Sequence, residues 1–485
     1  MSFLFKGSGT YAHIVKYTGV FGGVQMLSIL ATLVRNKFTA LLIGPFGMGL
    51  SSLFSTITLL MSQATGFGIS FSAVRHLSEI SSQGDNKELQ RYIGMVRAWT
   101  ILAALLGTIA CAIIGPLLCL YVFNGNDHTT DIIMLSPIVG MLTICGGESA
   151  ILKAMRQLKA LALIQTAGAL ASVMLSIPIY YMYGVRGIVA VMLAFNVFIL
   201  IITLWKSLHM YPLRFSGMWR NMGEGSPMIK LGMAFLLSGV AGTGAEMIVR
   251  SFLNMTASTD VVGLYNAAYI LTVTYSGLVF TAMETDYFPR LSAVNNDKNA
   301  FVLTANRQIE VSVLIISPLL AMMMIFLPLF VPLLYSDVFK AIVPMAQIAV
   351  TAMYFNAIKL PIAYMTLAKG HSIAFLILET MYASAYAVFT MIGYNLWGLT
   401  GAGLALLAAH VFDLIMIYIY AHLRYGFTLS HRSISYSMMQ LPLGAIVYII
   451  TLVGKGWLYW LTGLLIITLS TAISLWLLRK NVNRE

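Results

Sequence analysis

Two arginines lie inside segments that are otherwise apolar enough to cross a membrane. Arg35 is followed by Arg75 after 40 residues, and Arg250 is followed by Arg290 at the same distance. A charged side chain in the hydrocarbon of a bilayer is costly, so it commonly faces a partner or a water-filled cavity. Two such arginines at matching places in two halves of one chain suggest a cavity between related bundles that takes an anionic ligand. This pattern is typical of a transporter.

Arg35 and Lys37 are candidate substrate-binding residues. A guanidinium can hold a diphosphate through two parallel hydrogen bonds, whereas a lysine offers a point charge. For Arg35 the alternative is a structural ion pair. Lys37 lies nearer the end of its segment, and its ammonium could instead extend to the membrane surface.

Arg250 and Lys359 complete the predicted set of substrate-binding cations. Glu246 precedes Arg250 by one helical turn, so these two residues could pair with each other. A salt bridge that opens when the substrate arrives would satisfy both interpretations. Lys359 lies in the middle of another apolar segment, where it cannot easily reach either membrane surface.

Three carboxylates are candidates for binding a driving ion. Asp413 and Glu379 lie in the middle of apolar segments, where a carboxyl group is costly unless it binds a partner, a proton or a metal cation. Glu246 is the third candidate. We predict no metal site and no cofactor, because the sequence has no cluster with metal-ligand spacing.

A second group of charged residues lies near the expected cytoplasmic ends of the segments. Glu284, Asp286, Arg290 and Arg75 are candidates for a cytoplasmic gate. Glu148 lies in a similar place, and we expect it to pair with Lys153 or Arg156.

The composition places these residues in a polytopic membrane protein. Of the 485 residues, 59% are hydrophobic and only 9% are charged, with a mean hydropathy of +0.85; soluble domains carry about 25% charged residues. The net charge of +12 is spread over short loops, which excludes a nucleic-acid partner. We therefore predict an all-α fold in the lipid bilayer.

Fourteen segments are long enough to cross a bilayer. The expected spans are 15–43, 47–73, 92–122, 132–153, 160–182, 187–209, 229–256, 261–286, 308–333, 341–367, 371–393, 398–422, 436–454 and 456–478. With the N-terminus in the cytoplasm, only Arg186, Lys340 and Lys455 of the 29 Lys and Arg residues fall in the outer loops. Because basic loops stay inside, both termini are expected in the cytoplasm.

The chain also contains an internal repeat. The residues Tyr183 to Gly187 align with Trp397 to Gly401 at an offset of 214. We predict two parallel six-helix lobes, 1–210 and 228–425, and two additional spans in 426–485. Parallel repeats commonly surround a site near the middle of the bilayer, and rocking between them gives alternating access.

Several motifs resemble those of a known family. The stretches that carry the resemblance are Val34 to Phe38, Ile43 to Leu50, Val262 to Tyr265, Tyr287 to Ser292 and Tyr364 to Gly370. They are similar to polysaccharide flippases of the multidrug/oligosaccharidyl-lipid/polysaccharide exporter superfamily, above all to the O-antigen and related flippases.

The resemblance implies two six-helix lobes around a cationic cavity. It also implies that a polyprenyl-diphosphate-linked glycan moves from the cytoplasmic to the periplasmic leaflet of the bacterial inner membrane, and that the last two spans help to bind the lipid tail. A proton or sodium ion would drive the cycle, and polysaccharide polymerase machinery is a further candidate partner.

Three alternative functions can be compared with a polysaccharide flippase. A peptidoglycan lipid-precursor flippase would need the same cationic cavity. The sequence separates it poorly from an O-antigen flippase, although the opening motif looks more like the O-antigen group. A multidrug cation antiporter of the same superfamily would need an acidic, aromatic site, which the four candidate cations oppose. A membrane enzyme acting on the same lipid-linked donor would need a long outer loop with catalytic residues. The outer loops are short, so we predict that the chain is not an enzyme.

Overall fold

The computed structural model describes residues 10–83, 86–123, 125, 128–212, 222–453 and 456–482. Within these ranges the regular structure is helical throughout. The side chains of Arg75 and Asp286, both predicted gate residues, lie outside the described set.

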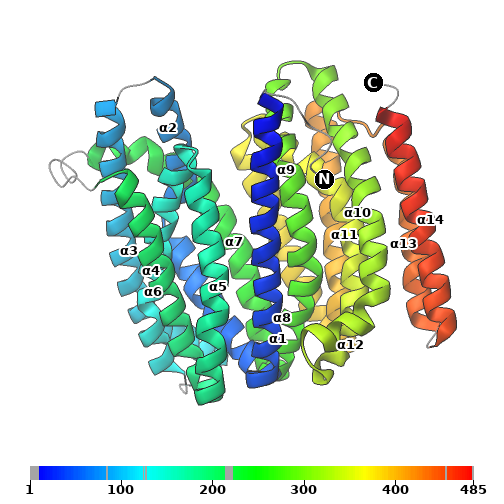
Figure 1. The fold of residues 1–485 in the computed structure, drawn as a ribbon, viewed down its shortest axis with the longest axis horizontal. Coiled ribbons are helices and arrows are strands. Elements are labelled where there is room, and N and C mark those ends of the chain that lie inside the picture. Colours follow the sequence, from blue (N-terminus) through cyan, green and yellow to red (C-terminus); the bar gives the residue numbers. More distant parts are fainter. Residues whose placement is uncertain are drawn as a thin grey trace. The chain divides into compact units, whose positions relative to one another are not determined.

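The helices of the described ranges are drawn in Figure 1. In chain order they are α1 (Thr10–Thr65), α2 (Ile69–Gln83), α3 (Asn86–Phe123), α4 (Thr129–Ala154), α5 (Leu158–Tyr183), η1 (Gly184–Gly187), α6 (Ile188–Met210), η2 (Met222–Gly225), α7 (Ser226–Thr256), α8 (Thr259–Tyr269), η3 (Ile270–Thr274), α9 (Tyr275–Ala293), α10 (Lys298–Leu334), η4 (Asp337–Ile342), α11 (Val343–Ala368), α12 (Ser372–Tyr425), α13 (His431–Val453) and α14 (Trp457–Val482).

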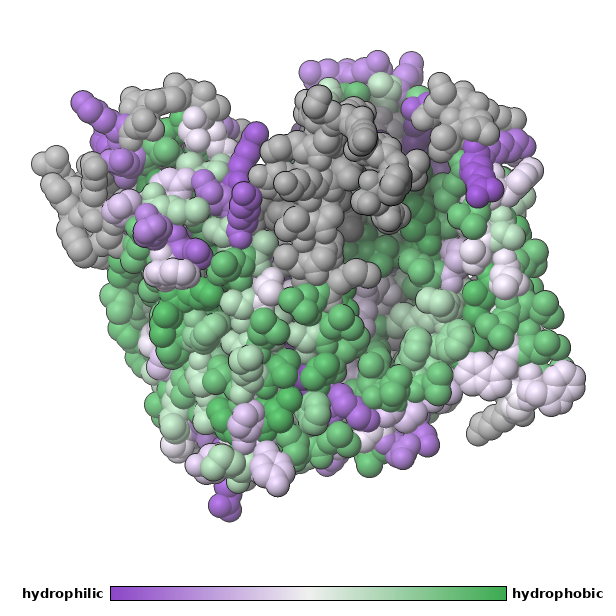
Figure 2. Space-filling model, viewed as in Figure 1, coloured by the Kyte–Doolittle hydropathy of each residue, from purple (hydrophilic) through white to green (hydrophobic). Residues whose placement is uncertain are grey.

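Ten stretches of the described chain are long and apolar enough to cross a membrane. Apolar side chains cover most of the visible surface along the helices, and hydrophilic side chains lie mainly toward the helix ends (Figure 2). In water such a surface would be unfavourable, whereas in a bilayer it faces lipid. The predicted all-helical membrane fold is confirmed, and the number of fourteen crossings stays a prediction.

Glycines break the longest of these stretches. In α1, Gly44 has φ 64° and ψ −170° and is followed by Pro45. In α12, Trp397 and Gly398 leave the helical region, with φ 57° at Gly398. Glycine adopts these angles without the steric cost of a side chain, and proline lacks the N–H that a continuous helix needs. Both breaks fall where the sequence predicted the division between two spans.

The internal repeat is visible in the backbone. Gly184 and Gly398, aligned by the offset of 214, both have positive φ. Arg156 and Gly370, which are separated by the same offset, also have positive φ, at 53° and 71°.

The connection after α4 repeats after α11 as well. The N–H of Gln157 donates to the carbonyl of Leu152, and the N–H of His371 donates to that of Thr366, both at 2.9 Å. These paired bonds close the ends of the two helices in the same way.

The chain divides into two compact units. Unit 1 comprises Met1–Gly47 and Leu53–Val240, and unit 2 comprises Met48–Ser52 and Ala241–Glu485. In unit 1, α4 packs against α2, α3 and α6; in unit 2, α11 packs against α10 and α12, and α10 also contacts α13 and α14. The predicted lobe boundaries at 210, 228 and 425 remain predictions.

Candidate functional site

Lys359 and Asp413 form a buried ion pair in unit 2. Lys359 lies in the middle of α11 and Asp413 in the second half of α12. The Lys359 Nζ atom is 2.7 Å from Asp413 Oδ2, and the two side chains are only 10% and 2% exposed. Each charge offsets part of the cost of burying the other. The sequence assigned Lys359 to substrate binding and Asp413 to ion coupling, whereas the structure brings them into direct contact.

A second carboxylate and two rings surround this pair. Glu379, also a predicted ion-coupling residue, interacts electrostatically with both Lys359 and Asp413. The Tyr382 ring lies 5.1 Å from the lysine Nζ, and the His410 ring meets the Tyr382 ring edge-on at 5.6 Å. One ammonium and two carboxylates leave an excess negative charge when all three are ionised. The group can therefore accept a proton or a monovalent cation.

Arg250 pairs with Glu246, as the spacing of one helical turn suggested. Its Nη2 atom lies 3.1 Å from Glu246 Oε2 on the same helix, α7, and also donates to Asn266 Oδ1 on α8 at 3.3 Å. The Arg250 side chain is 11% exposed and that of Glu246 is 30% exposed. The guanidinium is thus largely buried, whereas its carboxylate partner is partly exposed.

Four tyrosines of unit 2 contact one another and interact with the two ion pairs. The hydroxyls of Tyr265 and Tyr386 are 2.6 Å apart. The rings of Tyr265 and Tyr269 are stacked at 6.2 Å, as are those of Tyr382 and Tyr386 at 6.4 Å. Tyr269 and Tyr386 both interact electrostatically with Glu246, while Tyr382 lies beside the lysine of the other pair. Ring, hydrogen-bond and electrostatic contacts therefore link the two ion pairs of unit 2, and we call this group of residues the polar network.

Arg35 lies on α1, in unit 1. It is partly buried, its Nη2 atom donates to Asn36 Oδ1 at 3.3 Å, and it interacts electrostatically with Tyr180 on α5. Arg35 thus resembles Arg250 in donating to an asparagine carbonyl. Lys37 is also partly buried. A cavity shared by Arg35 and Arg250 stays a prediction.

Two of the four predicted gate residues have described side chains. Glu284 accepts a hydrogen bond of 2.5 Å from the hydroxyl of Tyr364 and interacts electrostatically with the lysine of the buried pair. Arg290 is exposed and donates to a glutamine of α10 at 3.3 Å. Glu284 is therefore connected to the polar network of unit 2. A gating role stays a prediction for all four residues.

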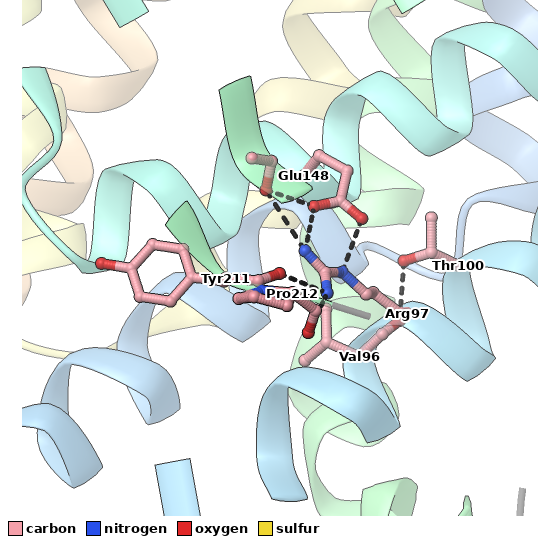
Figure 3. Close-up of polar contacts among 7 residues, drawn as sticks. Val96, Arg97, Thr100, Glu148, Tyr211 and Pro212 are labelled. Atoms are coloured by element: carbon pink, nitrogen blue, oxygen red, sulfur yellow. Dashed lines mark hydrogen bonds and ion pairs between the residues drawn. The ribbon is translucent and has the colours of Figure 1, made fainter. Parts of the chain in front are cut away.

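A buried charge network in unit 1 was missed by the sequence analysis (Figure 3). The Arg97 Nε and Nη2 atoms donate to the two carboxylate oxygens of Glu148 at 2.8 and 3.0 Å. Nη1 donates to the carbonyl of Tyr211 at 2.9 Å, and the hydroxyl of Ser207 donates to Glu148. Arg97 and Glu148 are only 4% and 5% exposed. The network connects α3 and α4 to the end of α6.

The prediction that Glu148 pairs with Lys153 or Arg156 was therefore wrong. Lys153 and Arg156 are exposed, whereas Glu148 is buried at the contact of α4 with α3 and α6. Arg97 lies within the predicted span 92–122. That position inside an apolar span was the signal that could have identified it.

Comparisons with known proteins agree with this architecture. Residues 38–344, more than half of the chain, match the family described as polysaccharide biosynthesis protein. No curated protein is similar enough in sequence to count as a match.

Several solved structures share the fold. The lipid II flippase MurJ in an inward closed conformation is 14% identical, with 95% of this chain and 99% of that chain covered and a TM-score of 0.74. An inward-facing multidrug resistance MATE family transporter of the MOP superfamily is 16% identical, with 83% and 94% covered and a TM-score of 0.65. A MOP superfamily transporter from Pyrococcus furiosus is 15% identical, with 84% and 93% covered and a TM-score of 0.53.

The helical fold, with its ten stretches able to cross a membrane, defines a multi-pass membrane protein that shares the fold of these solved structures. Within that class, the chain belongs to the polysaccharide biosynthesis protein family. The family resemblance stated from the sequence motifs is thereby confirmed.

Proposed function

We propose that the chain flips a polyprenyl-diphosphate-linked oligosaccharide across the bacterial inner membrane. The cargo would be the repeat unit of O-antigen, which becomes part of lipopolysaccharide, or of a related polysaccharide. The observation that carries this proposal is the largely buried Arg250 guanidinium, whose carboxylate partner Glu246 is partly exposed. A diphosphate offers this guanidinium a bidentate contact with more negative charge than one carboxylate. Membership of the polysaccharide biosynthesis family supports the choice of cargo.

The proposed cycle couples this exchange of partners to an ion. When the diphosphate binds Arg250, the salt bridge opens and the carboxylate of Glu246 loses its counter-charge. Glu246 keeps its interactions with Tyr269 and Tyr386. The tyrosines connect it to the group of Lys359, Asp413 and Glu379, which carries an excess negative charge. A proton or sodium ion bound there would neutralise that charge. Its binding and release on opposite sides of the membrane would make the protein an antiporter that works by alternating access.

The parts of the chain have separate roles in this proposal. The lobes 1–210 and 228–425 would rock around the cargo, and the helices in 426–485 would hold the polyprenyl tail. Both termini would lie in the cytoplasm. The family resemblance supports movement of the glycan from the cytoplasmic to the periplasmic leaflet.

Two other cargoes are compatible with the same fold. The similarity to the lipid II flippase favours a peptidoglycan lipid precursor, which also carries a diphosphate. The similarity to multidrug transporters favours an organic cation, and the excess negative charge around Asp413 and Glu379 would suit it. Arg35 and Arg250 oppose a cation and favour a diphosphate.

The deciding experiment is a lipid extraction from cells that lack the protein. We expect polyprenyl-diphosphate-linked oligosaccharide to accumulate while surface polysaccharide disappears, and the composition of the accumulated lipid would identify the cargo. Unchanged lipid and surface glycan, in a strain without a redundant flippase, would reject the proposal and direct attention to cation efflux.

A second experiment tests the two arginines. The double variant Arg35→Ala/Arg250→Ala should lose glycan export while its amount in the membrane stays normal. Arg186→Ala, which removes an exposed arginine of unit 1, is the matched control and should export normally. Full export by the double variant would remove the arginines from the binding site.

A further inference from the structure

Unit 1 contains a pocket of about 380 Å³ beside the break between α1 and α2. The break arises because Phe67 and Gly68 both have positive φ, at 52° and 64°. The other walls come from α4 and the first part of α7. The lining residues are Ser62, Gln63, Gly66, Gly68, Ile69, Ser70, Phe71, Leu142, Thr143, Gly146, Leu236, Ser238 and Gly239. The volume lies at the small end of the ~300–1,000 Å³ that ligand pockets span.

The walls of this pocket are held together by direct backbone contact. A Cβ atom on Gly68 would lie 2.2 Å from the carbonyl oxygen of Gly232 on α7, and a Cβ on Gly232 would lie 2.4 Å from that of Phe67. Only glycine permits such an approach. The break between α1 and α2 is therefore fixed against α7, and the pocket is formed before any ligand arrives.

The lining residues are uncharged, in contrast to the network in unit 2. A diphosphate or an organic cation would find no opposite charge among them, and burying it there would be costly. The lining instead combines hydroxyl groups, one primary amide and exposed backbone with an aromatic ring and aliphatic side chains. This mixture suits a neutral ligand that carries many hydroxyls on an apolar frame.

Two of the hydroxyl groups have defined hydrogen-bond donor and acceptor roles. Thr143 Oγ1 donates its proton to the carbonyl of Val139 at 2.8 Å. Ser62 Oγ lies 3.2 Å from Thr143 Oγ1, so Ser62 is the donor of that pair. The Ser62 oxygen keeps its lone pairs and can accept a hydrogen bond from a ligand hydroxyl. The Gln63 amide adds both donor and acceptor atoms to the same wall.

We propose that this pocket is a subsite for one uncharged sugar of the lipid-linked substrate. Ser62 and Gln63 bind the sugar hydroxyls, and Phe71, a residue that is 52% exposed, packs against the apolar face of the sugar. The diphosphate binds elsewhere, at arginine. This inference rests on the proposed function, because it assumes that the cargo carries a glycan.

The test uses the purified full-length protein and two lipids. One is bare polyprenyl diphosphate, and the other is the glycan-bearing polyprenyl diphosphate extracted from the host strain. Gly146→Leu fills the pocket, whereas Gly146→Ala is its matched control, because the added methyl would lie at an ordinary 3.5 Å from Ser70 Cβ. Thermal melting of each variant establishes that it is folded.

We expect Gly146→Leu to weaken binding of the glycan-bearing lipid by about tenfold or more and to leave binding of the bare lipid unchanged. Ser62→Ala and Gln63→Ala should each weaken binding of the glycan-bearing lipid by roughly two- to tenfold, which corresponds to the loss of one neutral hydrogen bond. These two variants decide the question if Gly146→Leu does not fold.

Two results would overturn the inference, and they differ from each other. If the variants lose affinity equally for both lipids, or for neither, the sugar subsite is rejected while the flippase proposal stays in place. If the wild-type protein binds neither lipid, the proposed function fails and the subsite fails with it.

Discussion

The substitution Asp413→Asn should strongly destabilise unit 2. It leaves the Lys359 ammonium buried without its counter-charge. Two unit charges 2.7 Å apart attract by about 6 kcal/mol at an effective dielectric constant of about 20. Asparagine recovers part of this through a hydrogen bond, so the expected loss is about 3–5 kcal/mol, the range for a broken buried pair. For a unit of this size that lowers the melting temperature by roughly 6–20 °C.

The double variant Lys359→Met/Asp413→Leu tests whether the loss of stability comes from an unpaired buried charge. Because both charges are gone, we expect it to melt close to the wild-type protein. Glu379→Gln is the control: it removes a neighbouring carboxylate, leaves the pair intact and should lower the melting temperature much less. Melting is measured on the full-length protein in the same detergent for all variants.

One outcome would refute the stability prediction, and another would refute the proposed role in ion coupling. If Asp413→Asn melts like the wild-type protein, the ion pair does not form in the folded chain. If the double variant is stable and still exports glycan at the full rate, the pair is structural and has no role in ion coupling.

Three further predictions concern other parts of the chain. Arg97→Lys should lose roughly 1.5–3 kcal/mol of stability, because an ammonium cannot make the two-pronged contact of the buried guanidinium, and a melting curve measures this loss. Arg156→Gly should raise the free energy of unfolding by about 0.5–1 kcal/mol, since arginine is strained at φ 53°. Gly370→Ala should lower the free energy of unfolding by a similar amount, and melting curves measure both changes. Arg250→Lys should keep normal membrane levels but reduce glycan export about tenfold, as measured by surface polysaccharide, because a lysine cannot bind a diphosphate bidentately.

The polar network of unit 2 could be predicted only in part. The Glu246–Arg250 pair follows from two residues separated by one helical turn, so it depends on local geometry alone. The pair of Lys359 and Asp413 depends on how α11 and α12 pack, and their side chains are 54 positions apart. The sequence identified both residues as unusual but could not tell that each was the other's partner.

Glu148 illustrates the same limit. Lys153 and Arg156 are the nearest cations in the sequence and were therefore the expected partners, but both residues are exposed. The actual partner, Arg97, is on another helix, and the contact follows from the packing of α3 against α4. Proximity along the chain predicts pairs on one helix, whereas pairs between helices require the tertiary structure.

The sequence by itself determined that the chain is a helical membrane protein with an internal repeat. Hydropathy is a property of each segment, and the breaks at Gly44 and Gly398 follow from the local freedom of glycine. Only the tertiary structure decided which buried charges neutralise each other, and only it revealed the uncharged pocket beside Phe67 and Gly68. Burial makes a partner necessary for a charged side chain, but the packing of helices decides which partner is within reach.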